Sequence, residues 1–324
     1  MAALRGVSEF AAIARLGRIF KASDARVVLG IGDDAALVRI PGRLVCTVDT
    51  AVEHVHFERR WLTLAELGAR SFHAAASDVS AMGGQPVAAL SNVIFPKPFS
   101  ERELEALARG QRAAARALGC SVVGGNLARG SELSVTTTVL GSVRKPLLRS
   151  GARVGDELWL CGAVGLAAAG LRLLQRGRSS AKSRAEQSAL AAWRKPKAAL
   201  AWGLELSRRA HAAIDISDGL AGDAAHLARE SGVRLVIECE ALRAALAPAL
   251  LELAPRLGVD ALELALYGGE DYALLATGPA RRRPRGARVI GAIAAGRGVW
   301  LSEAGKLSRA GLGFEHGAAR KSAR

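Results

Sequence analysis

The sequence predicts a globular α/β protein of two domains, and three observations predict it. The chain has 324 residues, more than one hydrophobic core usually organises, so two domains of roughly 150 residues are expected. Half of the residues are hydrophobic but only 4% are aromatic, which favours Ala-, Leu- and Val-rich helices packed on sheets. Strand-like runs also alternate with helical stretches along much of the chain.

In the first half, strands are expected at residues 27–31, 44–48, 87–95 and 133–140, with helices between several of them. Two capping-box patterns, Thr63 with Glu66 and Ser100 with Glu103, predict where two of these helices begin.

The polar, glycine-containing run from Arg149 to Asp156 predicts a domain boundary, which divides the chain into residues 1–148 and 149–324. Beyond it we expect strands at 157–161, 212–216, 233–238 and 272–277, and helices from Leu166 and over 220–231. Residues 177–188 are polar and rich in Ser, Lys and Arg, and we interpret them as a mobile surface loop.

The net charge of +15 would attract polyanions, and nucleic-acid binding is therefore one hypothesis. Its candidate patch is an arginine cluster at residues 281, 282, 283, 285 and 288. No aromatic residues interleave the cluster, so we favour a solvated loop and expect no specific nucleic-acid partner.

No stretch approaches the ~20 apolar residues of a membrane span, and no N-terminal segment resembles a signal peptide. We therefore expect a cytoplasmic protein without a membrane partner. The four cysteines are far apart, with no Cys-x-x-Cys pair, which predicts buried thiols rather than disulfides or zinc.

The segment Gly30–Asp34 matches part of a dinucleotide-binding fingerprint. Only nine residues separate Asp34 from Leu44, and they include Pro41 and Gly42, so no crossover helix fits and a strand, a turn and a second strand are expected. Adjacent aspartates would repel a bare pyrophosphate but would accept one through magnesium ions. Capping of the turn is the alternative role for both aspartates.

Other polar residues are expected where strands end. Asp49 follows a predicted strand, and His56 lies in the loop beyond it. Gly124–Asn126 follow a short strand, and Asp215–Gly219 join a strand to a helix. Asp78 lies near the end of an alanine-rich helix, where a carboxylate opposes the helix dipole and a cation would compensate it.

Gly268 and Gly269 precede two further acidic residues, Glu270 and Asp271. Each of these motifs has a structural alternative, such as a turn or a helix cap. Their recurrence in both halves of the chain predicts several magnesium ions held by carboxylates at a domain cleft.

These motifs resemble those of the thiamine-monophosphate kinase family, whose superfamily includes aminoimidazole ribonucleotide synthetase and selenophosphate synthetase. The resemblance spans nearly the whole chain and is most specific at residues 30–36, 49–57, 77–83, 215–220 and 268–272. It implies an α/β fold of the aminoimidazole ribonucleotide synthetase type, with an N-terminal sheet domain that dimerises and a C-terminal α/β domain. It also implies a homodimer in which ATP phosphorylates thiamine monophosphate to thiamine diphosphate.

The resemblance further implies the roles of individual residues. The Mg²⁺ ligands would be Asp34, Thr47, Asp49, Asp78, Asn126, Asp215 and Asp218. The residues contacting ATP would be Gly125, Asn126, Arg149 and Ser217, and those contacting thiamine monophosphate would be His56, Glu270 and Phe314.

This chemistry needs no acid–base residue, because the acceptor phosphate is already ionised at neutral pH. Two positions depart from the family pattern: Asn126 replaces an aspartate, and Val48 stands where a hydroxyl residue is frequent. Because a neutral amide oxygen binds magnesium more weakly than a carboxylate, we expect one weaker metal site.

Another superfamily member with a different acceptor remains the alternative enzyme. Selenophosphate synthetase and the hydrogenase-maturation relative are disfavoured, because the N-terminal glycine-rich segment and the C-terminus both lack a cysteine.

Overall fold

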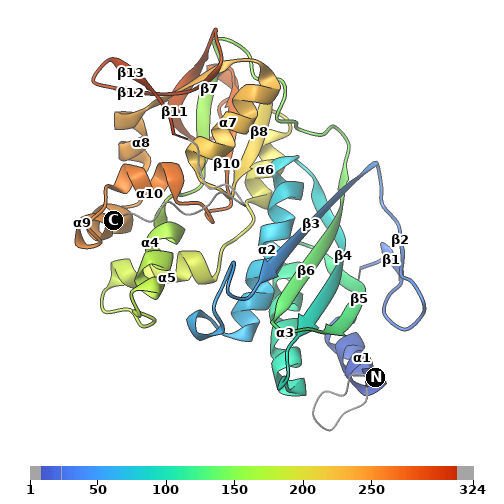
Figure 1. Ribbon diagram of the computed structural model, residues 1–324. Helices are drawn as coiled ribbons and strands as arrows, with labels where there is room; N and C mark the ends of the chain where they lie inside the picture. Colours follow the sequence, from blue (N-terminus) through green and yellow to red (C-terminus); the bar gives the residue numbers. More distant parts are fainter. Residues whose placement is uncertain (1–8, 23, 312–324) are drawn as a thin grey trace. The chain divides into compact units, whose positions relative to one another are not determined.

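The computed structural model describes residues 9–22 and 24–311. The chain forms two compact units (Figure 1), one of residues 1–147 with 194–208, the other of residues 148–193 with 209–324. The segment 194–208, which contains α6 (Leu200–Leu206), thus packs with the first unit although it lies between the two parts of the second in sequence. Within the described residues, no helix is both long and apolar enough to cross a membrane.

The first unit is built on a four-stranded sheet in the order β3-β6-β4-β5. Its strands are β3 (Arg43–Val52), β4 (Gln85–Phe95), β5 (Ser121–Arg129) and β6 (Ser134–Val143). Strands β4 and β5 run parallel, and α3 (Glu101–Ala117) supplies the crossover that a parallel pair requires.

Helices α2 (Leu64–Ala81) and α3 cover one face of this sheet (Figure 1). Both begin at the predicted capping boxes, of Thr63 with Glu66 and of Ser100 with Glu103. The helices pack unusually closely, since a Cβ atom on Gly110 would lie 1.9 Å from the carbonyl oxygen of Ala65. The core between helices and sheet includes Phe72, Val79 and Val139, all fully buried.

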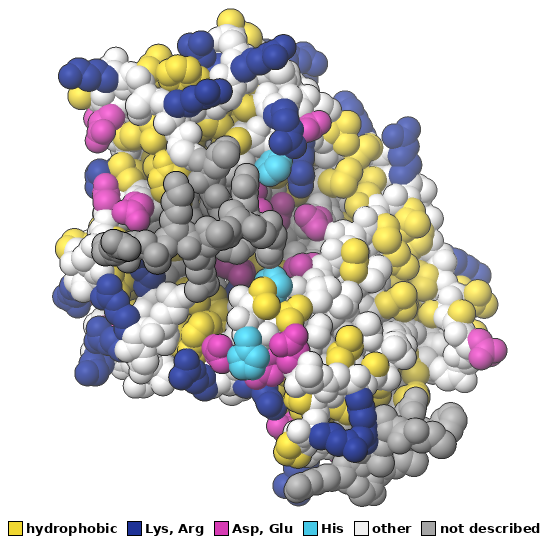
Figure 2. Space-filling model, viewed as in Figure 1, with side chains coloured by type: hydrophobic (Ala, Val, Ile, Leu, Met, Phe, Trp, Pro, Cys, Tyr) yellow, Lys and Arg dark blue, Asp and Glu magenta, His cyan; other side chains and the backbone are white. Residues whose placement is uncertain are grey.

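The opposite face of the sheet has no helix of this unit on it in Figure 1, and its strands alternate accordingly. Along β6, residues 135 to 143 are buried at every odd position and partly exposed at every even one. Leu44, Val48 and Leu90 are exposed at 57%, 62% and 39%. We call this the open face, and hydrophobic and uncharged side chains gather over it in the space-filling view (Figure 2).

The remaining elements of the unit precede or connect these layers. They are α1 (Glu9–Ile19), β1 (Val27–Leu29), β2 (Leu37–Val38) and the short helix η1 (Arg59–Trp61). Strands β1 and β2 pair antiparallel. The Gly30–Asp34 segment therefore connects a strand to a strand, as predicted, and does not open a helix.

The second unit is built on a seven-stranded sheet in the order β13-β12-β9-β11-β7-β10-β8. Its strands are β7 (Glu157–Cys161), β8 (Ala212–Ile216), β9 (Arg234–Glu238), β10 (Ala273–Gly278), β11 (Arg288–Ala294), β12 (Gly298–Glu303) and β13 (Lys306–Arg309). Within this sheet, β9 and β12 are the only described strands that pair in parallel. The fully buried run of β10, from Ala273 to Gly278, lies between β7 and β8.

The helices of this unit are α4 (Leu166–Gln175), α5 (Arg184–Arg194), α7 (Leu220–Ser231), α8 (Cys239–Ala245), α9 (Pro248–Arg256), α10 (Ala261–Tyr267) and the short helix η2 (Ala280–Arg282). Helices α7 and α8 pack directly on strands of the sheet. The mixed α/β class is confirmed.

Four local predictions were wrong. Asp49 and Gly124–Asn126 were expected after strands but lie inside them, since β3 continues to Val52 and β5 to Arg129. Both strands extend beyond their apolar residues because their backbones pair with neighbouring strands. Residues 184–188 are helical, because the Ser183 hydroxyl accepts from the Glu186 amide and starts α5. The Cys46 thiol is exposed, because it lies on the open face.

Candidate functional site

The first unit brings three of the predicted magnesium ligands to one face of its sheet. Thr47 and Asp49 are two residues apart on β3 and therefore point to the same side. On that side the Thr47 hydroxyl donates to the Asp78 carboxylate on α2, with Oγ1 and Oδ2 2.6 Å apart. One Asp49 oxygen accepts from the amide of Thr50 at 2.7 Å. Thr47 thus orients the Asp78 carboxylate, and strand β3 places the Asp49 carboxylate on the same side of the sheet.

Asn126 lies in a different row of the same sheet. Register pairs Asn126 with Asn92, Asn92 with Thr136, and Thr136 with Thr50. The hydroxyl oxygens of Thr50 and Thr136 are 2.9 Å apart, so this row is on the open face, whereas Thr47 and Asp49 are on the face with the helices. Asn126 is exposed there and is not brought beside Asp78.

The neighbouring Gly125 shows why β5 requires a glycine at this position. Its φ is +152°, and an added Cβ would lie 1.8 Å from the Ser91 carbonyl oxygen. A side chain at residue 125 would therefore displace β4 from β5.

Asp34 is exposed in the connection between β1 and β2. The Asp33 side chain accepts the Asp34 amide at 2.8 Å. Asp33 therefore has the turn-capping role that was considered for both aspartates.

His56 is held in the loop that follows β3. Its Nδ1 accepts from the amide of Val52 at 3.1 Å, so Nε2 carries the proton of the neutral ring and has the chemistry of a donor. The loop is anchored by the buried Glu53, whose carboxylate accepts from Arg59 at 2.9 Å and from the amide of Leu133 at 3.2 Å. No role for Glu53 is predicted from the sequence, because nothing in the motif distinguishes it from a surface acid.

In the second unit, strand β8 carries Asp215 as a buried carboxylate, and the next residues turn into α7. Gly219 precedes that helix with a φ of +111°, and its missing side chain leaves room for the backbone of Leu266 and Tyr267. The tight turn places Ser217 and Asp218 at the start of α7.

Asp223, in the first turn of α7, organises this turn. One of its carboxylate oxygens accepts from the amides of both Ser217 and Asp218, at 3.0 and 3.1 Å. Burial, with Asp215 and Asp218 nearby, raises the pKa of Asp223 to about 8. Sequence reasoning missed this residue, whose signal is an acidic side chain in the first turn of a helix that follows Asp-x-x-Asp-Gly.

This arrangement fits a divalent cation. Three carboxylates in a low-dielectric setting repel one another, and a bound cation would compensate their charge. Between residues 9 and 311, leaving out residue 23, no three His, Cys, Asp or Glu side chains are close enough to enclose a metal by themselves. Magnesium typically takes only one or two protein carboxylates, with water and substrate phosphates completing its octahedron.

The Gly268–Asp271 motif packs against the Asp215 loop. The Glu270 amide donates to the Ser217 carbonyl at 2.7 Å, and the Tyr272 amide to that of Ile216 at 2.8 Å. Glu270 has a positive φ of 64°, and its carboxylate accepts from the Tyr272 hydroxyl at 2.6 Å. Glu270 is therefore fixed beside Ser217.

Asp271 has a different role. Its carboxylate accepts from the amides of Gly165 and Ala167 at 2.7 and 3.4 Å, so it caps the start of α4. Burial raises the pKa of Asp271 to about 7. Asp271 therefore has a structural role, whereas the neighbouring Glu270 is a candidate for substrate binding.

Arg149 is exposed, but its backbone is fixed. The Ser231 hydroxyl donates to the Arg149 carbonyl at 2.8 Å and accepts from the amides of Gly151 and Ala152. The guanidinium is thus carried on an ordered turn at the end of α7. Phe314 lies outside the described residues.

Each unit therefore presents oxygen ligands of its own, the first together with a fixed histidine and the second together with Arg149. Side chains of these kinds can bind magnesium and phosphate groups.

Comparison with known proteins matches both parts of the chain to family models. Residues 32–143 match the N-terminal domain of the AIR synthase related proteins, and residues 153–282 match their C-terminal domain. The thiamine-monophosphate kinase of Mycobacterium tuberculosis is 36% identical over 296 residues, which cover 90% of this chain and 86% of that protein.

The chain belongs to the thiamine-monophosphate kinase family. The family member of Aquifex aeolicus is 34% identical over 78% of this chain and 81% of its own length. Both the resemblance stated from the motifs and the fold that it implied are confirmed.

Solved structures of the family agree. The thiamine-monophosphate kinase of Stenotrophomonas maltophilia superposes with a TM-score of 0.82 at 34% identity, over 91% of this chain and 96% of that one. AaThiL in complex with AMPPCP and TMP superposes with a TM-score of 0.78 at 31% identity, over 94% and 96%.

Proposed function

We propose that this chain carries the activity of its family and transfers the terminal phosphoryl group of ATP to thiamine monophosphate, forming thiamine diphosphate. The observation that carries the proposal is the match, over nearly the whole chain, to thiamine-monophosphate kinases. A relative with the same fold binds AMPPCP and TMP.

The carboxylates of both units would hold the magnesium ions: Asp34, Asp49 and Asp78 in the first, and Asp215 and Asp218 in the second, with Thr47 and Asn126 as neutral ligands. When bound, magnesium neutralises the phosphate charges that otherwise repel each other. Burial, with Asp215 and Asp218 nearby, raises the pKa of Asp223, and this group of buried and half-buried acids supports a cation at the second set.

The remaining candidates would position the two substrates. His56 can donate from Nε2 to the phosphate of thiamine monophosphate, because its Nδ1 is already occupied by the Val52 amide. Glu270 would contact the same substrate, as would Phe314. Gly125, Asn126, Ser217 and Arg149 would contact ATP, and Arg149 would add positive charge at the transferred phosphoryl group.

The reaction requires no proton acceptor on the protein. The attacking oxygen belongs to a phosphate that is ionised at neutral pH. The chain therefore accelerates the transfer by holding both phosphates in line and by balancing their charge.

We further propose that the chain works as a homodimer through the open face of the first unit. Exposed hydrophobic side chains of Leu44, Val48 and Leu90 support this, since a patch of exposed apolar side chains marks an interaction surface. Residues 1–148 would then form the dimerising domain, and 149–324 the second domain.

A cytoplasmic location is the last part of the proposal. All four cysteines are free in the structure, as expected in a reducing compartment.

A direct assay tests the activity. Purified protein with ATP, Mg²⁺ and thiamine monophosphate should form thiamine diphosphate and ADP in equal amounts, and chelation of magnesium should stop the reaction. Asp215→Asn should lower kcat by at least about a hundredfold, since it removes a charge that contacts the reacting groups. Glu252→Gln, on the exposed surface of α9, is the matched control and should retain the wild-type rate.

The acceptor is tested in the same experiment. ATP turnover that is equal with and without thiamine monophosphate, in folded protein, would contradict the assignment. Transfer to a different phosphorylated acceptor, with none to thiamine monophosphate, would favour another reaction of the superfamily.

A further inference from the structure

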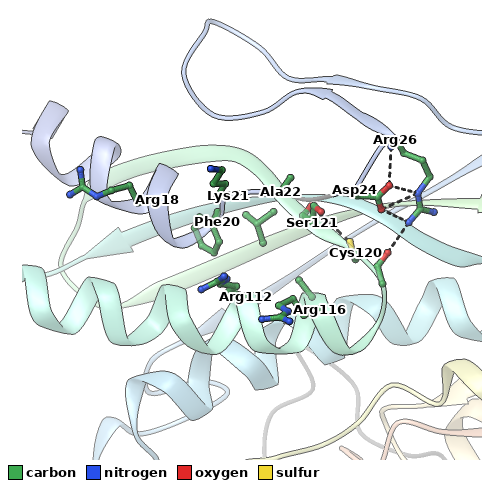
Figure 3. A pocket seen from close by; sticks show the side chains of 13 residues that line it. Arg18, Phe20, Lys21, Ala22, Asp24, Arg26, Arg112, Arg116, Cys120 and Ser121 are labelled. Carbon is green, nitrogen blue, oxygen red and sulfur yellow. Dashed lines mark hydrogen bonds and ion pairs between the residues drawn. The ribbon is translucent and has the colours of Figure 1, made fainter.

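The first unit contains a cavity of about 650 Å³ at the edge of its sheet, between α1, the C-terminal half of α3 and the beginning of β5 (Figure 3). Phe20, Ala115 and Val122, all buried, give it an apolar wall. Burial raises the pKa of the Cys120 thiol to about 12, so the thiol adds no charge. The volume is that of pockets which accept an organic ligand, roughly 300–1,000 Å³.

Positive side chains line this cavity. Arg112 and Arg116 are one turn apart on α3, and Arg18 and Lys21 come from the end of α1 and the segment after it. In Figure 3, Arg112 and Arg116 rise from α3 towards the segment that carries Phe20 and Lys21. Among the described residues, none of the four cations makes an ion pair.

Among the described residues that line the cavity, Asp24 is the only acid, and it is already neutralised. Asp24 accepts from Arg26 at 3.0 Å through Nε, and Arg26 lowers the pKa of the Asp24 carboxyl. Arg26 also donates to the Gly119 carbonyl at 2.8 Å. This pair ties the end of α3 to the segment before β1. The other four cations are exposed to solvent, and the pair leaves their charge free to attract an anion.

The fold explains two of those charges. Arg18 lies in the last turn of α1. Arg116 lies in the last turn of α3, where the helix dipole favours a cation. Arg112 lies farther from that end, and equal charges one turn apart repel each other. The acids of α3 are confined to its first turns, at Glu101, Glu103 and Glu105, where Arg15 and Arg109 pair with Glu101 and Glu105.

The cavity is separate from the candidate magnesium ligands Thr47 and Asp49 of the same unit, although Asn126 lies on β5, four residues beyond Val122. It adjoins β5, one edge of the four-stranded sheet, whereas Thr47 and Asp49 lie on β3, the other edge. Three strand spacings of ~4.8 Å separate the two edges.

We propose that this cavity binds a small phosphorylated metabolite. Its phosphate groups would contact Arg112, Arg116, Lys21 and Arg18, and its uncharged part would lie against Phe20. The proposal does not depend on the phosphoryl-transfer activity.

Calorimetric titration of the whole protein, with a chelator present to suppress magnesium-dependent nucleotide binding, tests the proposal. Phosphate, pyrophosphate and ADP are the probes, and affinity should rise in that order. Arg112→Gln with Arg116→Gln should weaken pyrophosphate and ADP binding by about tenfold or more, because charge-assisted contacts are lost. Hydrogen exchange should slow in residues 13–22 and 107–122 when ADP binds to the wild type.

Two controls locate the site. Arg102→Gln with Arg109→Gln removes the same charge from α3 outside the cavity and should leave the affinity unchanged. Asp49→Ala with Asp215→Ala should also leave it unchanged.

The proposal would be overturned if the two double arginine variants weakened ADP binding equally. It would also be overturned if the double aspartate variant lost ADP binding, or if the wild type bound none of the probes. Tighter, salt-sensitive binding of a single-stranded oligonucleotide than of ADP would assign the surface to nucleic acid and would likewise overturn it.

Discussion

At the scale of single residues, the candidate site depends on side chains that position others. Asp223 is not itself a predicted magnesium ligand. Its carboxylate accepts from the amides of Ser217 and Asp218 and so fixes the position of both. Thr47 does the same for Asp78 through one hydroxyl. Such residues fix the ligands before a metal arrives, which lowers the cost of ordering them on binding.

Asn126 provides a prediction about the metal. A neutral amide oxygen binds Mg²⁺ less strongly than a carboxylate, so Asn126→Asp should lower the Mg²⁺ concentration that gives half of the maximal rate, by roughly threefold to tenfold. Initial rates over a magnesium titration at saturating ATP measure this. Asn92→Asp, in the paired position on β4, is the comparison, and an equal shift in both variants would show that added charge alone acts.

His73 on α2 provides a prediction about pH. Burial, with a smaller contribution from Lys197, lowers the pKa of His73 to about 4 from 6.5, and Nδ1 accepts from the Ala198 amide at 3.3 Å. The unfolded chain therefore binds a proton between pH 6.5 and 4 that the folded chain does not. Stability from this group is complete above pH 6.5 and should fall by roughly 1–3 kcal/mol as the pH drops to 4.

Urea unfolding across this pH range tests the His73 prediction. His73→Gln keeps an acceptor but cannot titrate, so its free energy of unfolding should fall less steeply on acidification. His54→Gln changes a histidine that is 62% exposed and should keep the wild-type slope. Identical slopes in all three proteins would refute the prediction.

At the scale of elements, glycines set how closely segments approach. A Cβ on Gly269 would lie 2.5 Å from the Ser217 carbonyl oxygen, and φ is +74°. The Glu270 amide bonds to that same carbonyl. The approach of the Gly268–Asp271 segment to the Asp215 loop therefore requires glycine at residue 269.

Gly269→Ala should consequently lower both stability and activity. Gly258→Ala is the matched control, because its φ is +68° but no atom lies within 4 Å of the added Cβ. In both variants the left-handed backbone conformation of the new alanine lowers the free energy of unfolding by roughly 1 kcal/mol. Only Gly269→Ala must also displace the Asp215 loop. Thermal unfolding and kcat should separate them, and equal activities would contradict the proposed packing.

At the scale of the whole molecule, the exposed apolar side chains of the open face predict that the chain forms a dimer. The helices bury the other face with residues such as Val79 and Val139, while Val48 remains 62% exposed. Burying this apolar surface in a second copy would stabilise both chains by the hydrophobic effect.

Light scattering after size exclusion should therefore give twice the chain mass of 33.7 kDa. Val48→Glu should shift the protein to monomer, because a charge at the centre of an apolar interface is left without water. Leu251→Glu, at a leucine that is 42% exposed on α9, should leave the dimer intact. A monomeric wild type would refute the dimer.

Local signals in the sequence predicted much of the fold. The capping boxes gave the starts of α2 and α3, and the run into Asp215 gave β8 and α7 with the bounds observed, since helix caps and strand-to-helix turns depend on neighbouring residues. The same reasoning did not find β11 and β12, because they pair with β7 and β9, which are distant in the chain. It also did not find β13, which pairs with the neighbouring β12.

The sequence by itself determined the family and the identity of the candidate ligands, because the motifs are contiguous and chemically specific. Only the tertiary structure decided which of them are neighbours. It separated Asn126 from Asp78 by placing them on opposite sides of one sheet, and it revealed Glu53, Asp223 and the cationic cavity. Those features arise from strand register and helix packing between segments far apart in the chain, which no single stretch of residues specifies.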